Sequence, residues 1–178
     1  MRSARRWAIA LVPTLFLRLA RADSAELGLA GEELAARALR RAGWKLLARR
    51  MVTPHGEVDV VTSGGGLLVC VEVKTGRLPD LPAPRAEQPG AVAGSALCSA
   101  RLRWRPGLRL DHERLERQRR AGLWLARRLE GSSRGSARLV GGRVDLIEVL
   151  VPARSGRPIL IHHEDLRQPP WPVRGLRG

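Results

Sequence analysis

Two neighbouring segments carry acidic side chains at the spacing of β-strands. Residues 57–61 read Glu-Val-Asp-Val-Val, residues 67–74 read Leu-Leu-Val-Cys-Val-Glu-Val-Lys, and a Ser-Gly-Gly-Gly turn lies between them. Side chains two residues apart on a strand point to the same side. The hairpin therefore predicts one polar face that holds both acids of the first segment together with Cys70, Glu72 and Lys74. The opposite, apolar face would carry Val58, Val60, Val69, Val71 and Val73.

A pair of carboxylates beside a lysine suits the hydrolysis of phosphodiester bonds. The hairpin would bring Asp59 and Glu72 together at one end, with Lys74 beside them. Clustered carboxylates repel one another unless a metal ion or neighbouring cations offset their charge. Oxygen ligands without a nearby thiolate pattern favour Mg²⁺ or Mn²⁺ over zinc. Such an ion could polarise a phosphoryl oxygen, while the lysine could position or deprotonate the attacking water.

Lysine is scarce in this chain, which makes its presence beside the acids informative. It occurs only at Lys45 and Lys74, because arginine supplies all the other basic residues. Arginine cannot act as a compact point charge or lower its pKa towards neutrality. From spacing alone, a solvated strand with Glu72 and Lys74 in a weak surface ion pair remains an alternative.

The segments around the hairpin predict an α/β fold, with a small mixed β-sheet flanked by helices. Residues 23–42 have the three- and four-residue apolar spacing of an amphipathic helix, and Asp23 and Glu26 have the spacing of a capping box. The other expected elements are a strand at 44–50, a helix at 111–130 capped by Asp111, and strands at 143–151 and 159–162, the last at a sheet edge.

These elements predict one domain over residues 23–151. A long proline-rich loop or insertion is expected at 76–110, and an edge segment with a proline-rich tail at 152–178. Residues 1–22 form a basic apolar leader whose apolar run is too short to span a bilayer, which takes about 20 residues. A cleaved secretory signal, a basic amphipathic surface helix and a disordered or mistranslated leader all remain open for it. The chain is expected to be cytoplasmic, with export or membrane association through residues 1–22 as the alternative.

The composition favours a polyanionic partner. The 178 residues include 32 Lys and Arg against 17 Asp and Glu, a net charge of +15, while 44% hydrophobic content excludes wholesale disorder. Strong positive potential attracts nucleic acid or an anionic membrane. Five arginines are predicted to contact nucleic acid, although a charged loop and a solvated helix face would look the same: Arg101, Arg103, Arg105, Arg114 and Arg117.

Four short motifs follow one another along the chain, and each occurs once. They are Gly28-x-x-Gly31-Glu32-x-x-Ala35-Ala36, Gly56-Glu57-Val58-Asp59, Val69-Cys70-Val71-Glu72-Val73-Lys74-Thr75 and Arg143-Val144-Asp145-Leu146-Ile147. Together they resemble the YraN-like family of small bacterial proteins within the PD-(D/E)XK nuclease superfamily, whose fold is that of restriction endonucleases. The resemblance covers roughly residues 27–149, apart from the loop.

The resemblance implies roles for the polar residues of the hairpin. Asp59 and Glu72 would be metal ligands, the Val73 carbonyl a third ligand, and Lys74 the residue that activates water. The metal would be Mg²⁺ or Mn²⁺, the substrate DNA in branched or single-stranded form, and no small-molecule cofactor is expected. The oligomeric state stays open.

Two further acids have roles implied only by the resemblance. Glu32 would approach the metal from the first helix, and Glu57 would be an accessory catalytic carboxylate; plain surface positions remain an equal alternative for both. One departure from the family pattern is Arg114, which stands where the family usually has a lysine.

The expected function is therefore a Mg²⁺- or Mn²⁺-dependent nuclease-fold protein that binds DNA and cleaves phosphodiester bonds. The first alternative is a nucleic-acid-binding protein of the same fold that cuts nothing. A basic membrane-surface protein is the other.

Overall fold

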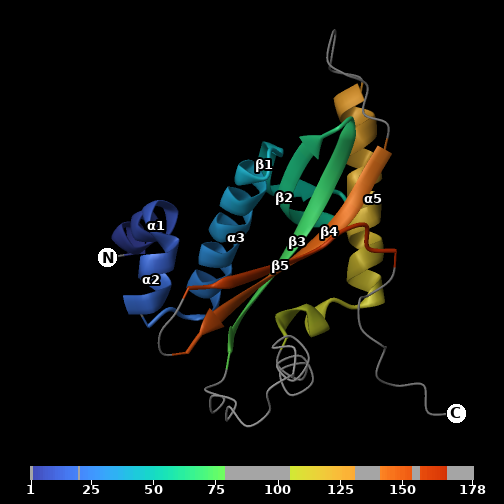
Figure 1. The fold of residues 1–178 in the computed structure, drawn as a ribbon. Helices are drawn as coiled ribbons and strands as arrows, with labels where there is room; N and C mark the ends of the chain where they lie inside the picture. The colour runs from blue at the N-terminus through green and yellow to red at the C-terminus, as the bar shows by residue number, and fades with distance from the viewer. Residues whose placement is uncertain (1, 20, 79–104, 131–140, 154–156, 168–178) are drawn as a thin grey trace, which may run out of the picture.

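Five strands form a single mixed sheet in the order β1-β2-β3-β4-β5 (Figure 1). The computed structural model describes residues 2–19, 21–78, 105–130, 141–153 and 157–167. The strands are β1 (Lys45–Thr53), β2 (Gly56–Gly64), β3 (Leu67–Leu78), β4 (Gly141–Pro152) and β5 (Ile159–His163).

The sheet combines a local meander with one long-range parallel pairing. Strands β1, β2 and β3 pair antiparallel in sequence order, β3 pairs parallel with β4, and β5 lies antiparallel to β4 at the edge. The predicted mixed sheet flanked by helices and the edge position of the last strand are confirmed. This architecture is compatible with a restriction-endonuclease-like fold.

Two helices with side-chain caps cover the two faces of the sheet. Helix α3 (Ser24–Arg41) begins with the predicted capping box, in which Asp23 accepts the Glu26 backbone N–H at 2.8 Å and the Glu26 carboxylate accepts the Asp23 backbone N–H at 3.1 Å. Helix α5 (His112–Glu130) begins at the predicted cap, where Asp111 accepts the Arg114 backbone N–H at 2.7 Å. Both helix predictions are confirmed.

The core is divided into two apolar layers, one on each face of the sheet. The α3 layer contains Ala30, Ala35, Leu39, Val60, Val69, Val71, Val73, Ile147 and Val149. The α5 layer contains Val58, Val61, Leu68, Cys70, Leu115, Ala121, Leu125 and Leu146.

The prediction that all five valines share one face is wrong for Val58. That side chain packs in the α5 layer, whereas Val60 packs in the α3 layer. The pairing of β2 with β3 ends at Val60 and Val71, and the alternation of side chains along β2 is interrupted at the same place. Cys70 does lie on the face of Glu72, but α5 covers it completely, and this burial raises the pKa of its thiol to about 12.

Helix α3 lies directly against β3 at a glycine. A Cβ atom placed on Gly31 would fall 1.8 Å from Oγ1 and 2.9 Å from Cβ of Thr75. Only glycine permits this approach, which brings the following residue of the helix, Glu32, towards the end of β3 that carries the acids.

The first residues of the chain pack onto the domain and do not stand apart from it. Helices α1 (Arg2–Leu11) and α2 (Pro13–Leu19) lie on the outer side of α3 (Figure 1), where Ile9, Phe16 and Leu17 join the α3 layer of the core. The helical interpretation of residues 1–22 agrees with this arrangement. None of the described helices is long and apolar enough to cross a membrane.

The expected loop is shorter at both ends than the sequence predicts. Strand β3 continues to Leu78 because it pairs with β4 along its whole length. The 3₁₀ helix η2 (Pro106–Arg109) and the buried Leu110 close the other end. Arg101 and Arg103 fall within 79–104, outside the described residues.

The expected boundary after residue 151 also changes. β5 pairs with β4, and the buried Leu166 packs in the α5 layer, so the domain continues past that boundary. The proline-rich tail, residues 168–178, falls outside the described part of the chain.

The contact at Gly31 can be tested with a matched glycine on the same helix. Gly31→Ala should lower the free energy of unfolding by about 1–3 kcal/mol, because its methyl group would overlap Thr75. Gly28→Ala should raise it by about 0.5–1 kcal/mol, since nothing lies within 4 Å of the added Cβ and alanine favours a helix. Chemical denaturation measures both values, and equal effects of the two substitutions would contradict the close approach.

Candidate functional site

Glu72 lies on β3 beneath α5, and its side chain has no solvent exposure. Lys74 Nζ lies 2.6 Å and Arg114 Nε 2.5 Å from the same carboxylate oxygen, Oε1. The Gln118 side-chain amide donates to the other oxygen, Oε2, at 2.9 Å. Two cations and an amide therefore stabilise a charge that water cannot reach.

Asp59 lies where β2 and β3 separate. Beyond the last backbone pair of the two strands, its Oδ2 accepts the backbone N–H of Val73 at 2.8 Å. The side chain thus occupies the position of a ladder carbonyl, and this holds it beside Glu72. The structure confirms that the hairpin brings Asp59, Glu72 and Lys74 together.

The environment of Asp59 raises the pKa of its carboxyl group. Burial and the negative charge of Glu72 raise the pKa of Asp59 from 3.8 to about 7, against the opposing hydrogen bond from Val73. A cation that binds here would favour the ionised form, so its binding would release a proton near neutral pH.

Glu32 and Glu57 lie at the margin of the same acidic group. Glu32 is half-buried on α3, and its Oε2 has no hydrogen-bond partner among the described residues. Burial raises the pKa of Glu32, and the nearby Arg50 and Arg49 oppose that shift. Glu57 is exposed and pairs with Arg50 Nε at 3.0 Å. Arg50 itself has a φ of 49°, an uncommon conformation for a residue other than glycine.

The donor set fits a hard divalent cation in its chemistry. Asp59, Glu72, Glu32 and the Val73 carbonyl offer only oxygen atoms, which suit Mg²⁺ or Mn²⁺, and the unpartnered Glu32 Oε2 is a spare acceptor. Within the described ranges, however, no three His, Cys, Asp or Glu side chains are grouped as a metal site. The ammonium of Lys74 and the guanidinium of Arg114 both contact Glu72 Oε1, so an ion bound to this oxygen would have to share it with them or displace them.

Three of the arginines predicted to contact nucleic acid lie in the described part of the chain, and each has a protein partner. Arg114 contacts Glu72 within the site, and Arg117 pairs with Glu113 on the surface of α5. Arg105 pairs with the buried Glu148 of β4. Each of the three would have to exchange its carboxylate for a phosphate in order to bind DNA.

Gln118 is a site residue that the sequence analysis missed. Its amide reaches both Glu72 Oε2 and, at 3.1 Å, the Glu57 carbonyl. The sequence feature that could have identified Gln118 is its position four residues after Arg114, because residues four apart share a helix face.

A second buried acid lies directly beside the site on the next strand, and sequence reasoning also missed it. Glu148 stands opposite Lys74 in the parallel register of β3 and β4. Its carboxylate accepts the Gly107 backbone N–H at 2.7 Å and contacts His163 Nε2 at 2.9 Å, in addition to Arg105. This cluster ties η2 and β5 to the strand that borders the site.

The fourth motif forms a similar cluster on the other face of β4. Asp145 is fully buried and contacts Arg143 Nε at 2.9 Å and His162 Nε2 at 2.8 Å. Its Oδ1 accepts the Asp165 backbone N–H at 3.0 Å. Each of these contacts is structural, because Asp145 holds the segment after β5 against the sheet.

The family described as "Uncharacterised protein family UPF0102" matches residues 31–149. A UPF0102 protein of Streptomyces griseus is 37% identical over 136 residues, which cover 76% of this chain and 91% of that protein. Shorter matches include UPF0102 proteins of Syntrophomonas wolfei, 54% identical over 52 residues (29% of this chain, 45% of that protein), and Symbiobacterium thermophilum, 44% identical over 54 residues (30% and 46%).

The raised pKa of Asp59 predicts a pH-dependent effect of Asp59→Asn on stability. The cost of ionising the buried carboxyl is absent below its unfolded pKa of 3.8, grows as pH rises, and is complete above about 7. Asparagine keeps the acceptor for Val73 and cannot ionise. The variant should therefore melt at a higher temperature than the wild type at about pH 8, and at nearly the same temperature at about pH 4.

Glu113→Gln is the matched control, because its side chain is 80% exposed. It should show no such gain in melting temperature at the higher pH. A gain of equal size for both variants would mean that burial does not perturb Asp59.

Proposed function

The chain belongs to the uncharacterised protein family UPF0102, the YraN family, and from the geometry of its site we propose a function. The proposed reaction is the metal-dependent hydrolysis of phosphodiester bonds in DNA. The observation that carries this proposal is the convergence of Asp59, Glu72 and Lys74 where β2 and β3 separate. Branched or single-stranded DNA is the proposed substrate form.

The two acids supply the ligands in this proposal. Asp59 and Glu72 are held by the Val73 N–H and by α5, so their oxygen atoms are oriented before substrate arrives. Mg²⁺ or Mn²⁺, when bound, supplies Lewis-acid activation of the phosphoryl group and of water. Glu32 adds a third carboxylate from α3, and its Oε2 accepts no hydrogen bond in the described structure.

Lys74 orients the water and meets the developing negative charge. Its side chain is 16% exposed, and its ammonium lies 2.6 Å from Glu72, which leaves the remaining hydrogens to donate to a water or a phosphate oxygen. Water adds to phosphorus as one P–O ester bond breaks, and the products are a phosphomonoester and an alcohol. A fixed ammonium stabilises the charge that forms on the phosphoryl oxygens.

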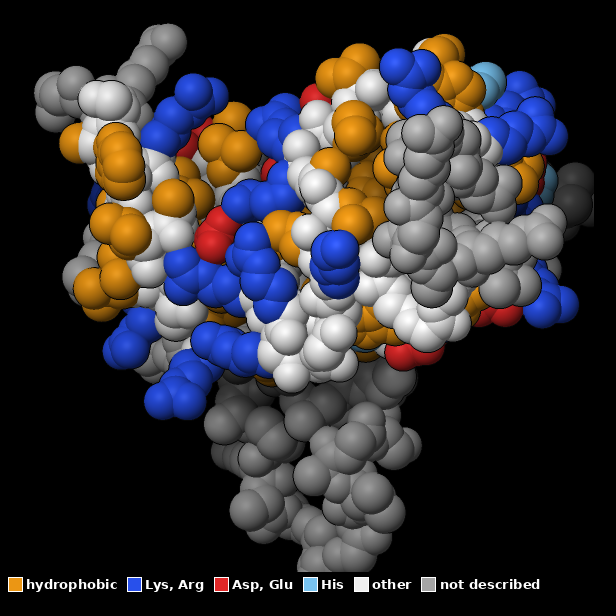
Figure 2. Space-filling model, turned by 90° about the horizontal axis from the view of Figure 1, so that it is seen from above, with side chains coloured by type: hydrophobic (Ala, Val, Ile, Leu, Met, Phe, Trp, Pro, Cys, Tyr) orange, Lys and Arg blue, Asp and Glu red, His pale blue; other side chains and the backbone are white. Residues whose placement is uncertain are grey.

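Arg114 and the overall charge support the binding of the substrate. The Arg114 side chain is 37% exposed, and its guanidinium can leave Glu72 for a phosphate with which it makes paired hydrogen bonds. A net charge of +15 attracts DNA in a salt-dependent way. Figure 2 shows basic side chains left of the centre of one face and at its upper right, with fewer acidic ones among them.

A DNA-binding protein that does not cut is the second candidate. One observation favours it: Lys74 and Arg114 already neutralise Glu72, so the acid needs no metal for its burial. Cleavage assays separate the two candidates.

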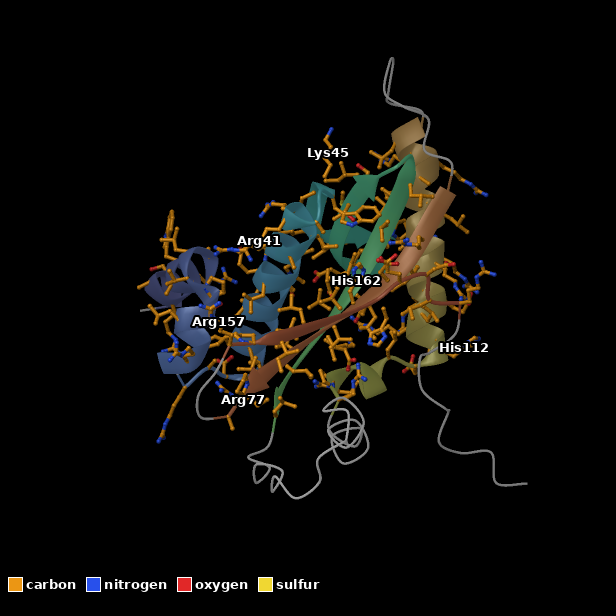
Figure 3. The ribbon with its side chains drawn as sticks, in the orientation of Figure 1. Arg41, Lys45, Arg77, His112, Arg157 and His162 are labelled. Carbon is orange, nitrogen blue, oxygen red and sulfur yellow. The ribbon has the colours of Figure 1, made fainter. Side chains whose placement is uncertain are left out.

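Lys74→Ala should lower metal-dependent cleavage by at least about 100-fold, the usual contribution of a positioned acid or base. Labelled duplex, single-stranded and four-way junction DNA are incubated with Mg²⁺, with Mn²⁺ and with chelator, and the products are separated on gels. Lys45→Ala is the matched control, since the only other lysine is exposed at the start of β1, where it pairs with Ser63 next to the β2–β3 turn, and it is labelled at the top of Figure 3. It should cleave as the wild type does.

Asp59→Ala should abolish cleavage in the same assay while the binding of DNA persists. Binding without cutting under every metal would refute the nuclease proposal and leave the second candidate. Cleavage that both variants retain would refute the assigned site.

A further inference from the structure

An apolar surface lies on the N-terminal helix pair, away from the proposed nuclease site. We call it the N-terminal patch: Trp7, Leu11, Val12 and Leu15, with exposures of 68%, 64%, 46% and 48%. The other large hydrophobic side chains exposed in the described structure lie on β1, on β5 and on α5. Figure 2 shows the hydrophobic side chains gathered at the left edge, on the side of α1 and α2 in Figure 1.

The patch is held outward by contacts on the other side of the same helices. Ile9, Phe16 and Leu17 are buried against α3, so the opposite side of the pair must face solvent. Arg5 binds both carboxylate oxygens of Glu26, at 2.5 and 2.7 Å. A fixed apolar surface of this kind marks an interaction site.

Guanidinium groups surround the patch. A groove of about 360 Å³ is lined by Leu11, Val12 and Leu15 together with Arg18, Arg37 and Arg157, and none of its described lining residues is acidic. Arg37 pairs with Glu33 at 2.7 Å, whereas Arg18 and Arg157 are exposed. Figure 3 shows Arg157 beside the N-terminal helices, just before β5. Arg6 lines a second hollow with Trp7. The surface thus combines apolar side chains with positive charge.

We propose that α1 and α2 lie in the surface of an anionic lipid bilayer, with the N-terminal patch among the acyl chains and the surrounding arginines against lipid phosphates. Helix α1 has 10 residues and helix α2 has 7, too few to span a bilayer, which takes about 20, so the pair rests in its plane. The charge favours this occupant over a second copy of the chain. A twofold contact would oppose Arg18 and Arg157 of one copy to the same arginines of the other.

This binding is independent of the nuclease proposal. The helices precede residues 31–149, which the family matches, and they lie on the outer side of α3, whereas Glu72 faces α5. Lipid and DNA would therefore bind different surfaces. Loss of one interaction need not affect the other.

The test is sedimentation of the full chain with phosphatidylcholine vesicles, with and without phosphatidylglycerol. The wild type should bind the anionic vesicles. The double variant Trp7→Ser/Leu11→Ser should bind them at least about 10-fold more weakly, because two exposed apolar side chains lose their insertion. Both substitutions lie on the surface, and an unchanged melting temperature shows that the fold is kept.

Leu123→Ser is the matched control, because Leu123 is 55% exposed on α5 and its replacement leaves the charge unchanged. It should bind vesicles as the wild type does. Equal binding by the wild type and the patch variant would overturn the proposal, since a basic chain attracts anionic lipid through charge alone. Absence of binding to anionic vesicles would also overturn the proposal. So would light scattering that shows a dimer for the wild type and a monomer for the patch variant, if both bind vesicles equally.

Discussion

The burial of a charged carboxylate at Glu72 is the constraint on which the candidate site depends. An ion removed from water destabilises a fold by several kcal/mol unless polar partners surround it, on the order of the whole stability of a small domain. Its partners are Lys74 from the same strand and Arg114 and Gln118 from α5. The position of α5 on the sheet therefore depends on these contacts. Burial, together with the negative charge of Glu72, raises the pKa of the neighbouring Asp59.

The same solution recurs on β4. Glu148 joins η2 and β5 to the sheet on the α5 face, and Asp145 joins the segment after β5 on the other face. Each buried acid collects partners from segments far apart in sequence. Polar clusters in the interior thus determine which segments meet, while the two apolar layers supply most of the favourable burial.

The local parts of this fold and site were predictable, and the parts that depend on distant pairing were not. The helix caps at Asp23 and Asp111, and the meeting of Asp59 with Glu72, follow from short-range spacing. The face of the sheet on which Val58 lies depends on where the pairing of β2 with β3 ends, and the spacing of apolar residues in the sequence does not show that position. The cluster at Glu148 depends on a parallel register set across a long connection. The packing of α1 and α2 on α3 was not predictable from the sequence, because a basic and apolar N-terminal segment has the composition of a leader peptide.

The burial of Cys70 turns one atom into a reporter of motion between α5 and the sheet. Its Sγ would lie 3.3 Å from a Cβ placed on Gly122, so the helix backbone covers the thiol closely. A thiol with a pKa of about 12 and no solvent access reacts only when its cover opens. In a chain whose Cys98 is replaced, the rate of alkylation at Cys70 therefore measures how often α5 separates from the sheet. The same opening would admit water to Glu72.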